Sequence, residues 1–362
     1  MSLRFLRELK EYRELLRAAE LEERPAGLLV SGAVEAVKPL LIAQLLLDFE
    51  KPRRSLVFLR PEGSPLAGFT DQVRFFLDEL LKGSVGRPQK ETIQCPHVAA
   101  LPPLSENPYL EVPHSLEVVS SRMHYFRRLC RRPPDLTVTT LRGILKPIPH
   151  KASLAKAFLT LEKGSLMDRD RLLHWLRMSG YTREDLVNTH GEYAWRGGIV
   201  DVFSPWEDLP FRIELGADKV VSLRTFDPSS QRSHARRKDI EIPALREFPG
   251  SDSFFREWEE VARIRGRSMA WDDLTKKIER LHEGDIFPSF SYLALLAGDR
   301  FRLPLDFLES PLYVIDGYPE VSERWNETLE DFGEQAEDLR SQKKFVAAPG
   351  AVSYTHLRAH ET

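Results

Sequence analysis

The chain has 362 residues, of which 42% are hydrophobic and 30% charged, and its formal net charge is −3. At roughly 100–200 residues per domain, this length predicts two or three domains. The small net charge excludes a protein that binds nucleic acid through a global basic excess. Only Cys95 and Cys130 are present, which excludes a disulfide framework and favours a cytoplasmic location. No run approaches the ~18 apolar residues of a membrane span, so we expect no membrane association.

The first part of the chain alternates predicted helices and strands. Leucines at helical spacing predict an amphipathic helix over residues 3–20. Strands are predicted at residues 27–31, 55–59, 98–101 and 136–139, and the helices between them follow Gly32 through Leu47, then cover 71–81 and 116–129. Strands that alternate with helices are typical of a parallel sheet covered by helices. We therefore expect a doubly wound α/β domain here.

The middle of the chain has a different pattern. A short helix is predicted at residues 168–178, followed by strands at 199–203, 211–215 and 220–226. Short strands separated by tight turns predict an antiparallel sheet. We interpret this segment as a smaller α+β domain.

The last part is predicted to be mostly helical, at residues 254–263, 271–282 and 320–344. The apolar run Leu312–Asp316 predicts a strand that returns to the first sheet, which makes the middle domain an insertion into a discontinuous α/β domain. Residues 351–362 fit no pattern of their surroundings and resemble translated adapter sequence, so we expect a fragment. The expected boundaries are 1–24 for the N-terminal helix, 25–153 and 246–347 for the α/β domain, 154–245 for the insertion and 348–362 for the tail.

One segment has the spacing of a phosphate-binding loop, GxxxxGK[ST]. Gly32 and Lys38 fit that spacing, but Val37 stands in place of the second glycine and Pro39 in place of the Ser or Thr. A Cβ at Val37 hinders the close backbone approach to phosphate, and Pro39 lacks both a magnesium ligand and an N–H donor. Glu35 adds negative charge where phosphates would lie. The alternative is an ordinary strand–turn–helix with a chance lysine, and both interpretations predict no tight nucleotide binding.

Two further patterns support the absence of catalysis. Leu312–Asp316 followed by Gly317 is similar to a Walker B strand, but the catalytic acid expected after Asp316 is missing. The histidines are scattered, and none forms a pair with zinc-ligand spacing. The sequence therefore predicts no catalytic residue and no metal site.

The most informative segment runs from Gly180 to Ser233. Its motifs are Gly191–Tyr193, Arg196–Phe203, Phe211–Glu214, Phe226–Pro228 and Gln231–Ser233. They closely resemble the second domain of UvrB and of bacterial transcription-repair coupling factors. Leu104–Tyr109 and Thr139–Leu145 resemble the first domain of the coupling factors, so the resemblance covers roughly residues 25–345.

This resemblance carries expectations about fold and function. It implies a degenerate P-loop NTPase-like, UvrB-like α/β domain with an inserted domain that binds UvrA. UvrB keeps an intact loop, so Val37 and Pro39 favour the coupling factors. The resemblance implies no cofactor for this segment. In full-length relatives it implies ATP with magnesium, DNA translocation, and contact with RNA polymerase and DNA through downstream domains.

The resemblance also implies partner-binding residues. The arginine of the RGG motif and the arginine of the following strand contact UvrA in the family, and these correspond to Arg196 and Arg212. Glu214 and Leu215 follow on the same strand, where relatives often have an aromatic pair, so Leu215 is the remaining apolar anchor. The alternative is that each arginine forms an internal salt bridge, with Glu192 or Glu214.

Two basic runs leave other functions open. They are Arg122, Arg127, Arg128, Arg131 and Arg132, and then Arg232, Arg236, Arg237 and Lys238. Either run could contact DNA phosphates or could be a solvated surface. The alternatives to a UvrA-recruiting module are therefore a divergent UvrB-like DNA-dependent ATPase, acting as an excision-nuclease subunit, and a stand-alone DNA-binding protein.

Overall fold

A computed structural model describes residues 3–20, 30–49, 55–82, 95–104, 109, 114–248, 251–265, 270–282, 286–287, 289–296 and 301–346. The chain divides into two compact units. The first unit comprises residues 1–103, 131–144 and 305–325, and the second comprises 104–130, 145–304 and 326–362. The expected tail at 348–362 lies outside the described residues, and the expected domain boundaries stay a prediction.

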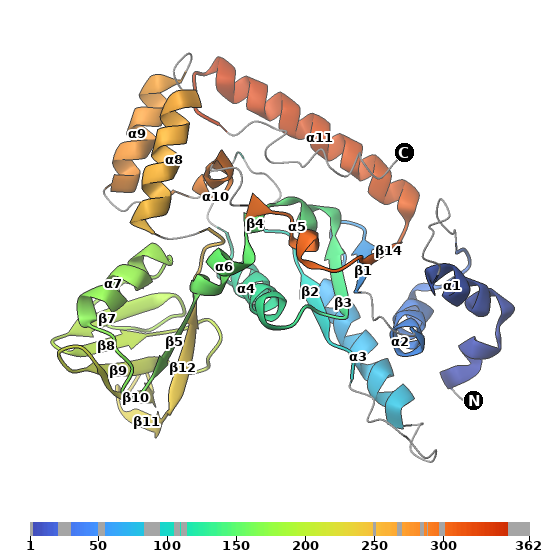
Figure 1. The fold of residues 1–362 in the computed structure, drawn as a ribbon, viewed down its shortest axis with the longest axis horizontal. Helices are drawn as coiled ribbons and strands as arrows, with labels where there is room; N and C mark the ends of the chain where they lie inside the picture. Colours follow the sequence, from blue (N-terminus) through green and yellow to red (C-terminus); the bar gives the residue numbers. More distant parts are fainter. Residues whose placement is uncertain are drawn as a thin grey trace. The chain divides into compact units, whose positions relative to one another are not determined.

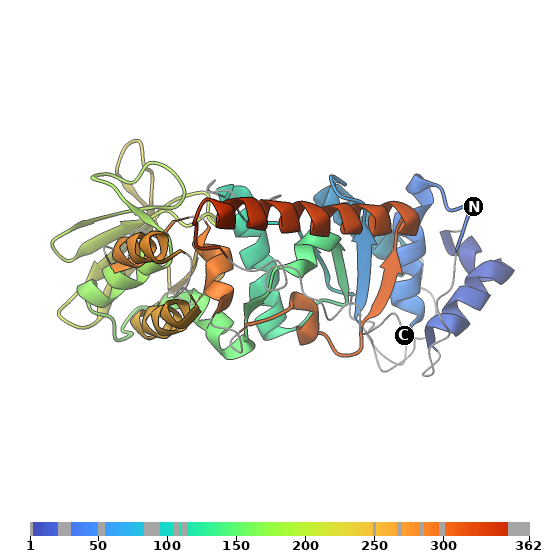
Figure 2. The same cartoon turned by 90° about the horizontal axis from the view of Figure 1, so that it is seen from above.

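The first unit contains a four-stranded parallel sheet in the order β14-β1-β3-β2. Its strands are β1 (Leu56–Arg60), β2 (Val98–Leu101), β3 (Leu136–Thr140) and β14 (Leu312–Ile315). β14 lies beside β1 although they are far apart in the sequence (Figure 1 and Figure 2). The prediction that the late strand returns to the first sheet is thus confirmed. Every residue of β1 and β3 is buried, as expected for inner strands of a parallel sheet.

Two helices pack together with this sheet in one apolar core. They are α2 (Lys38–Asp48) and α3 (Leu66–Lys82). α2 is apolar around most of its circumference, which is typical of a helix buried on several sides. The N-terminal segment forms a 3-10 helix at Leu3–Glu8 and then α1 (Lys10–Glu20), and its Leu6 and Tyr12 enter the same core.

The strand predicted at residues 27–31 lies mostly outside the described residues. The described part, Val30 and Ser31, is in neither a helix nor a strand. Gly32 has a φ of +83°, and a 3-10 turn at Glu35–Val37 leads into α2. Pro39 lies in the first turn of α2, where its missing N–H costs no helical hydrogen bond.

The second unit contains a six-stranded sheet in the order β11-β10-β9-β8-β7-β6. The strands are β6 (Thr182–Arg183), β7 (Glu192–Arg196), β8 (Ile199–Val202), β9 (Phe211–Leu215), β10 (Val220–Phe226) and β11 (Ser233–Arg236). All neighbours are antiparallel except β6 and β7. Helix α7 (Arg169–Met178) covers one face, where Leu172 and Leu176 share a core with Val200 and Ile213 (Figure 1).

The remaining helices and strands belong mainly to the second unit, but α5 up to Ile144 and the start of α11 belong to the first. They are α4 (Leu116–Arg131), α5 (Leu141–Leu145), β4 (Ile148–Pro149), α6 (Lys151–Leu154), β5 (Phe158–Glu162), β12 (Asp239–Pro243), α8 (Asp252–Arg265), α9 (Trp271–His282), α10 (Phe290–Leu293), β13 (Phe301–Arg302) and α11 (Tyr318–Ser341). β5 pairs with β12, and β4 pairs with β13. A parallel sheet with helices and a separate antiparallel sheet confirm the predicted mixed α/β class.

Candidate functional site

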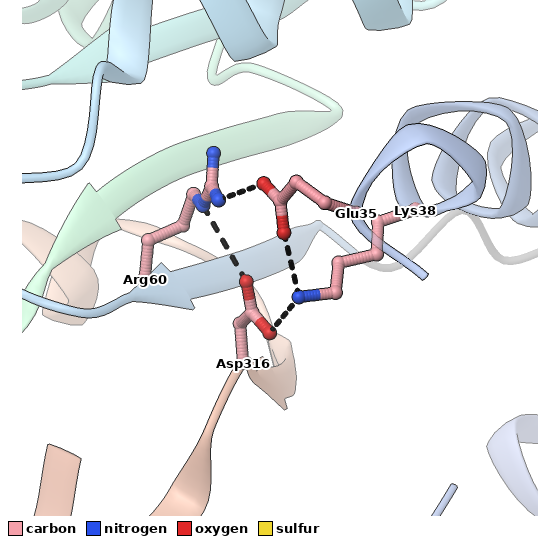
Figure 3. A network of polar contacts seen from close by, with 4 residues as sticks. All are labelled: Glu35, Lys38, Arg60 and Asp316. Atoms are coloured by element: carbon pink, nitrogen blue, oxygen red, sulfur yellow. Dashed lines mark hydrogen bonds and ion pairs between the residues drawn. The ribbon is translucent and has the colours of Figure 1, made fainter. Parts of the chain in front are cut away.

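Four charged side chains, Glu35, Lys38, Arg60 and Asp316, form a ring in the first unit (Figure 3). Lys38 Nζ lies 2.7 Å from Glu35 Oε2 and 2.7 Å from Asp316 Oδ1. Arg60 closes the ring, because it pairs with Glu35 and its Nε lies 3.5 Å from Asp316 Oδ2. Cations and carboxylates therefore alternate around the ring, and their formal charges cancel.

The local sequence explains how these side chains meet. The turn at Glu35–Val37 points Glu35 back toward Lys38 at the start of α2. Arg60 is the last residue of β1 and Asp316 directly follows β14, so adjacent parallel strands bring both side chains to the same edge of the sheet. This is the edge at which α/β sheets usually bind ligands.

The ring favours the charged forms of Lys38 and Glu35. Burial alone would lower the pKa of Lys38, but hydrogen bonds to Asp316 and Glu35 raise it above its ordinary value. The hydrogen bond from Lys38 lowers the pKa of Glu35, against the effect of burial, and the charge of Arg60 acts in the same direction. A phosphate at Lys38 would have to displace a carboxylate that is already ion-paired.

The RGG motif of the second unit forms the tight turn between β7 and β8. Gly197 has a φ of +56°, a conformation that glycine adopts without strain. A Cβ on Gly198 would lie 2.7 Å from the carbonyl oxygen of Leu215, so this position has no room for a side chain. The two glycines thus fix the turn that carries Arg196. The side chain of Arg196 is exposed, and its Nη2 lies 3.4 Å from the carbonyl oxygen of Asp185.

Arg212 lies on β9 and is internally paired. Its Nε and Nη2 donate to the two carboxylate oxygens of Asp201 at 2.8 Å each, and Nη2 also donates to Gln231 Oε1 at 3.0 Å. Its guanidinium carbon lies 4.2 Å from the centre of the Phe226 ring. The hydrogen bond with Asp201 raises the pKa of Arg212 against the effect of burial. The internal salt bridge considered for this arginine therefore exists, but its acid is Asp201 rather than Glu192 or Glu214.

The other two predicted partner-binding residues lie on opposite faces of β9. Glu214 shares the face of Arg212, where it accepts a hydrogen bond from Ser222 and lies 3.4 Å from Arg224. Leu215, expected as an apolar anchor, is instead 7% exposed and lies in the core on the α7 side. Strand alternation explains this difference, since neighbouring residues point to opposite faces. Arg196 and Glu214 are the accessible members of the set.

Several members of the two basic runs form ion pairs within the chain. Arg122, considered for DNA contact, is fully buried and pairs with Glu247, which also pairs with Lys146. Burial alone would raise the pKa of Glu247, but the charges of Arg122 and Lys146 lower it to about 2. Arg127 pairs with Glu241 and Arg237 with Glu207. Arg122 is thus a structural residue.

Two residues of these networks were not anticipated from the sequence. Arg60 ends an apolar strand and looks like an ordinary surface charge until Glu35 and Asp316 are placed beside it. Asp201 alternates with buried valines in β8, which was the available signal that it points to the same face as its partner on β9. Within the described residues, no group of His, Cys, Asp and Glu could hold a metal ion, and no helix is long and apolar enough to cross a membrane.

Residues 159–248 match a family model described as the UvrB interaction domain. The chain is 29% identical over 270 residues to the transcription-repair-coupling factor of Myxococcus xanthus, covering 71% of this chain and 22% of that protein. It is 30% identical over 197 residues to that of Escherichia coli (strain K12), covering 54% and 16%. The middle segment is thus similar to the UvrB interaction domain, and the chain is similar to the transcription-repair coupling factors.

The resemblance seen in the sequence is thereby confirmed. A further coupling factor, of Mycobacterium tuberculosis (strain CDC 1551 / Oshkosh), is 32% identical over 143 residues, covering 38% of this chain and 12% of that protein. The chain thus spans about a fifth or less of the length of these relatives. The segment that matches the family model begins within β5 and ends just after β12, and it contains Arg196 and Arg212.

Proposed function

We propose that this chain is the UvrA-recruiting module of a transcription-repair coupling factor that acts in transcription-coupled nucleotide excision repair. The observation that carries the proposal is the UvrB interaction domain at residues 159–248, in which a tight turn presents the exposed Arg196 beside the face that carries Arg212 and Glu214. The coupling-factor relatives support the choice of this pathway.

Arginine chemistry suits this role. A guanidinium offers a planar set of donors that pairs with a carboxylate through two hydrogen bonds, and arginine is enriched at interaction hot spots. Arg196 has no ion pair in the described parts of the chain, so its donors are available to a partner. Arg212 contributes through a guanidinium that Asp201 and Gln231 hold in place. Leu215 supports β9 from the core side.

We further infer that the first unit is a degenerate P-loop NTPase-like, UvrB-like fold without ATP hydrolysis. The charge-neutral ring of Glu35, Lys38, Arg60 and Asp316 supports this inference. Val37 and Pro39 lead into α2 and offer neither a glycine nor a magnesium ligand. This segment then needs no cofactor, and ATP and magnesium would act elsewhere in the full-length protein. DNA translocation, displacement of stalled RNA polymerase and a cytoplasmic location belong to the same proposal.

A pull-down with UvrA tests the recruitment role. The 362-residue chain is immobilised, and capture of UvrA is compared between the wild type and the double variant Arg196→Ala, Arg212→Ala. The exposed Arg171 lies on α7, which covers the opposite face of the sheet, so Arg171→Ala is the matched control. We expect capture by the wild type and the control and a loss in the double variant. Equal capture of UvrA by the wild type, the double variant and the control would contradict the assignment of Arg196 and Arg212 to the binding site.

A second candidate is a divergent UvrB-like ATPase. The contact between Lys38 and Asp316 favours it, because a lysine and a strand-end aspartate also meet in working P-loop sites. That function requires Mg-ATP to displace Glu35 from Lys38. Micromolar binding of Mg-ATP in calorimetry would favour this candidate over the recruitment module.

A further inference from the structure

Three arginines lie directly opposite one another across three strands of the six-stranded sheet. Arg212 of β9 is the partner of Arg224 on β10, and Arg224 is the partner of Arg236 on β11. Residues that face each other across antiparallel strands point to the same side, with Cβ atoms about 5 Å apart. We call Arg212, Arg224 and Arg236 the arginine row.

Like charges in such positions destabilise a sheet unless other groups compensate them. The charge of Arg212 is fully compensated, because Arg212 donates two hydrogen bonds to the carboxylate of Asp201. Compensation is weaker at Arg224, whose Nη2 lies 3.4 Å from Glu214 and whose buried Nε has no hydrogen-bond partner among the described residues. Arg236 is exposed, and the described part of the chain offers it no ion pair. The unneutralised charge therefore grows from β9 toward β11.

The position of the row makes it accessible to a partner. Helix α7 packs on the other face of the sheet through Leu172 and Leu176. β11 is the edge strand of the sheet, and each of its four residues is exposed. A row that points away from the core and ends at an edge can be reached from solvent without any change in the fold.

The surroundings of the row favour a protein partner over a nucleic acid. Ile199 is 40% exposed and lies between Arg196 of β7 and Glu214 of β9 in the cross-strand register. An exposed apolar side chain among arginines is typical of protein interfaces, in which apolar contacts and charge pairs are combined. The excess of arginine calls for carboxylates on the opposing surface.

We propose that the arginine row extends the partner-binding surface from Arg212 across β10 and β11, where Arg224 and Arg236 pair with carboxylates of an acidic patch on UvrA. This inference rests on the proposed function, because it enlarges the same surface. Arg224 supplies a guanidinium that is 37% exposed and lies 3.4 Å from the carboxylate of Glu214, and Arg236 supplies the exposed charge at the edge. The row then sets the extent of the interface and its dependence on salt.

The test is a titration of UvrA with the 362-residue chain at low and high salt. The variants are Arg224→Gln, Arg236→Gln and their combination, with Arg171→Gln as a control of equal charge change on the α7 side. We expect each row variant to weaken binding about twofold to fivefold, and the combination about tenfold, since exposed charge pairs contribute modestly. The difference from wild type should shrink at high salt, and Arg224→Lys should restore only part of the affinity because it lacks the planar fork.

Arg196→Ala in the same titration separates this inference from the proposed function. If Arg196→Ala weakens UvrA binding but neither Arg224→Gln nor Arg236→Gln does, the proposed role of the arginine row is overturned and the recruitment role is not. Absence of wild-type binding would overturn both. Thermal unfolding of each variant establishes that it is folded. A loss of duplex-DNA retention in the combined variant, with UvrA binding unchanged, would overturn the inference in favour of a phosphate-binding surface.

Discussion

Lys38 Nζ lies 2.7 Å from Asp316 Oδ1, although the two residues are 278 positions apart in the sequence. This pair joins the start of α2 to the end of β14 within one sheet-based unit. Glu35 and Arg60 complete the ring around it. The two cations at this edge of the sheet are thus paired with the protein's own carboxylates.

Asp316→Asn should destabilise the chain, because it leaves Lys38 and Arg60 with one carboxylate between them. Their side chains are 23% and 8% exposed, so we expect the free energy of unfolding to fall by about 1–3 kcal/mol. Urea unfolding followed by circular dichroism measures the change. Asp71→Asn breaks an exposed ion pair with Arg74 and is the control, with an expected cost of about 0–1 kcal/mol. Equal effects of the two substitutions would argue against a structural ring.

The wild-type chain should give no heat of binding with Mg-ATP in calorimetry. The double substitution Val37→Gly, Pro39→Ser should not by itself produce Mg-ATP binding, because Lys38 remains ion-paired with Glu35. Adding Glu35→Ala to that pair removes the internal competitor and should give the strongest phosphate binding of the series. Nucleotide binding by the first pair alone would show that the ring is not the obstacle.

Much of this fold follows from local patterns in the sequence. The alternation of strands and helices predicted a parallel sheet, and the parallel pairing of β1 with β3 confirms that prediction. The pairing of β5 with β12 was not predicted, because each strand is short and its partner lies far along the chain. Helix α3 begins at Leu66 rather than at residue 71, where the predicted helix began.

The charged sites were harder to predict for a physical reason. A sequence shows that Arg212 is charged, but its acid depends on the register between β8 and β9, which places Asp201 opposite it. The same holds for Arg60, whose partners come from a turn and from a distant strand. Which charged side chains are paired within the protein depends on the strand register and on which distant segments lie together, not on residue type alone.

Gly198→Ala should destabilise the six-stranded sheet. The added Cβ would lie 2.7 Å from the carbonyl oxygen of Leu215, and a backbone atom within a sheet cannot easily move aside. We expect a loss of about 1–3 kcal/mol in the free energy of unfolding. Gly68→Ala in α3, where the added Cβ meets no atom within 4 Å, should instead be neutral or stabilising by up to about 1 kcal/mol. A neutral Gly198→Ala would contradict the close approach of β8 and β9.

A double-mutant cycle should find strong coupling between Arg212 and Asp201. Both side chains are mostly buried and share two hydrogen bonds, so we expect a coupling energy of about 1–2 kcal/mol. The pair Arg224 and Glu214 is more exposed and more distant, and its coupling should be about 0–1 kcal/mol. Unfolding of the single and double alanine variants gives both values. Similar coupling in the two cycles would mean that Arg212 is not held internally.

Stability should depend on pH through His114. Burial, with the charges of Lys146 and Arg122, lowers the pKa of His114 from 6.5 to about 4. Between these values the unfolded chain binds more protons at this residue than the folded chain, so stability decreases as pH falls from about 6.5 to about 4. His114→Gln should make urea midpoints less sensitive to pH over this window. The same pH dependence in wild type and variant would contradict the burial of the imidazole.

Calorimetric titration of UvrA into the 362-residue chain, without nucleotide, measures the proposed recruitment directly. We expect saturable binding by the wild type, no detectable binding by the folded double variant Arg196→Ala, Arg212→Ala, and unchanged binding by Arg171→Ala. No binding by the wild type, or equal dissociation constants for wild type and double variant, would contradict the proposed recruitment.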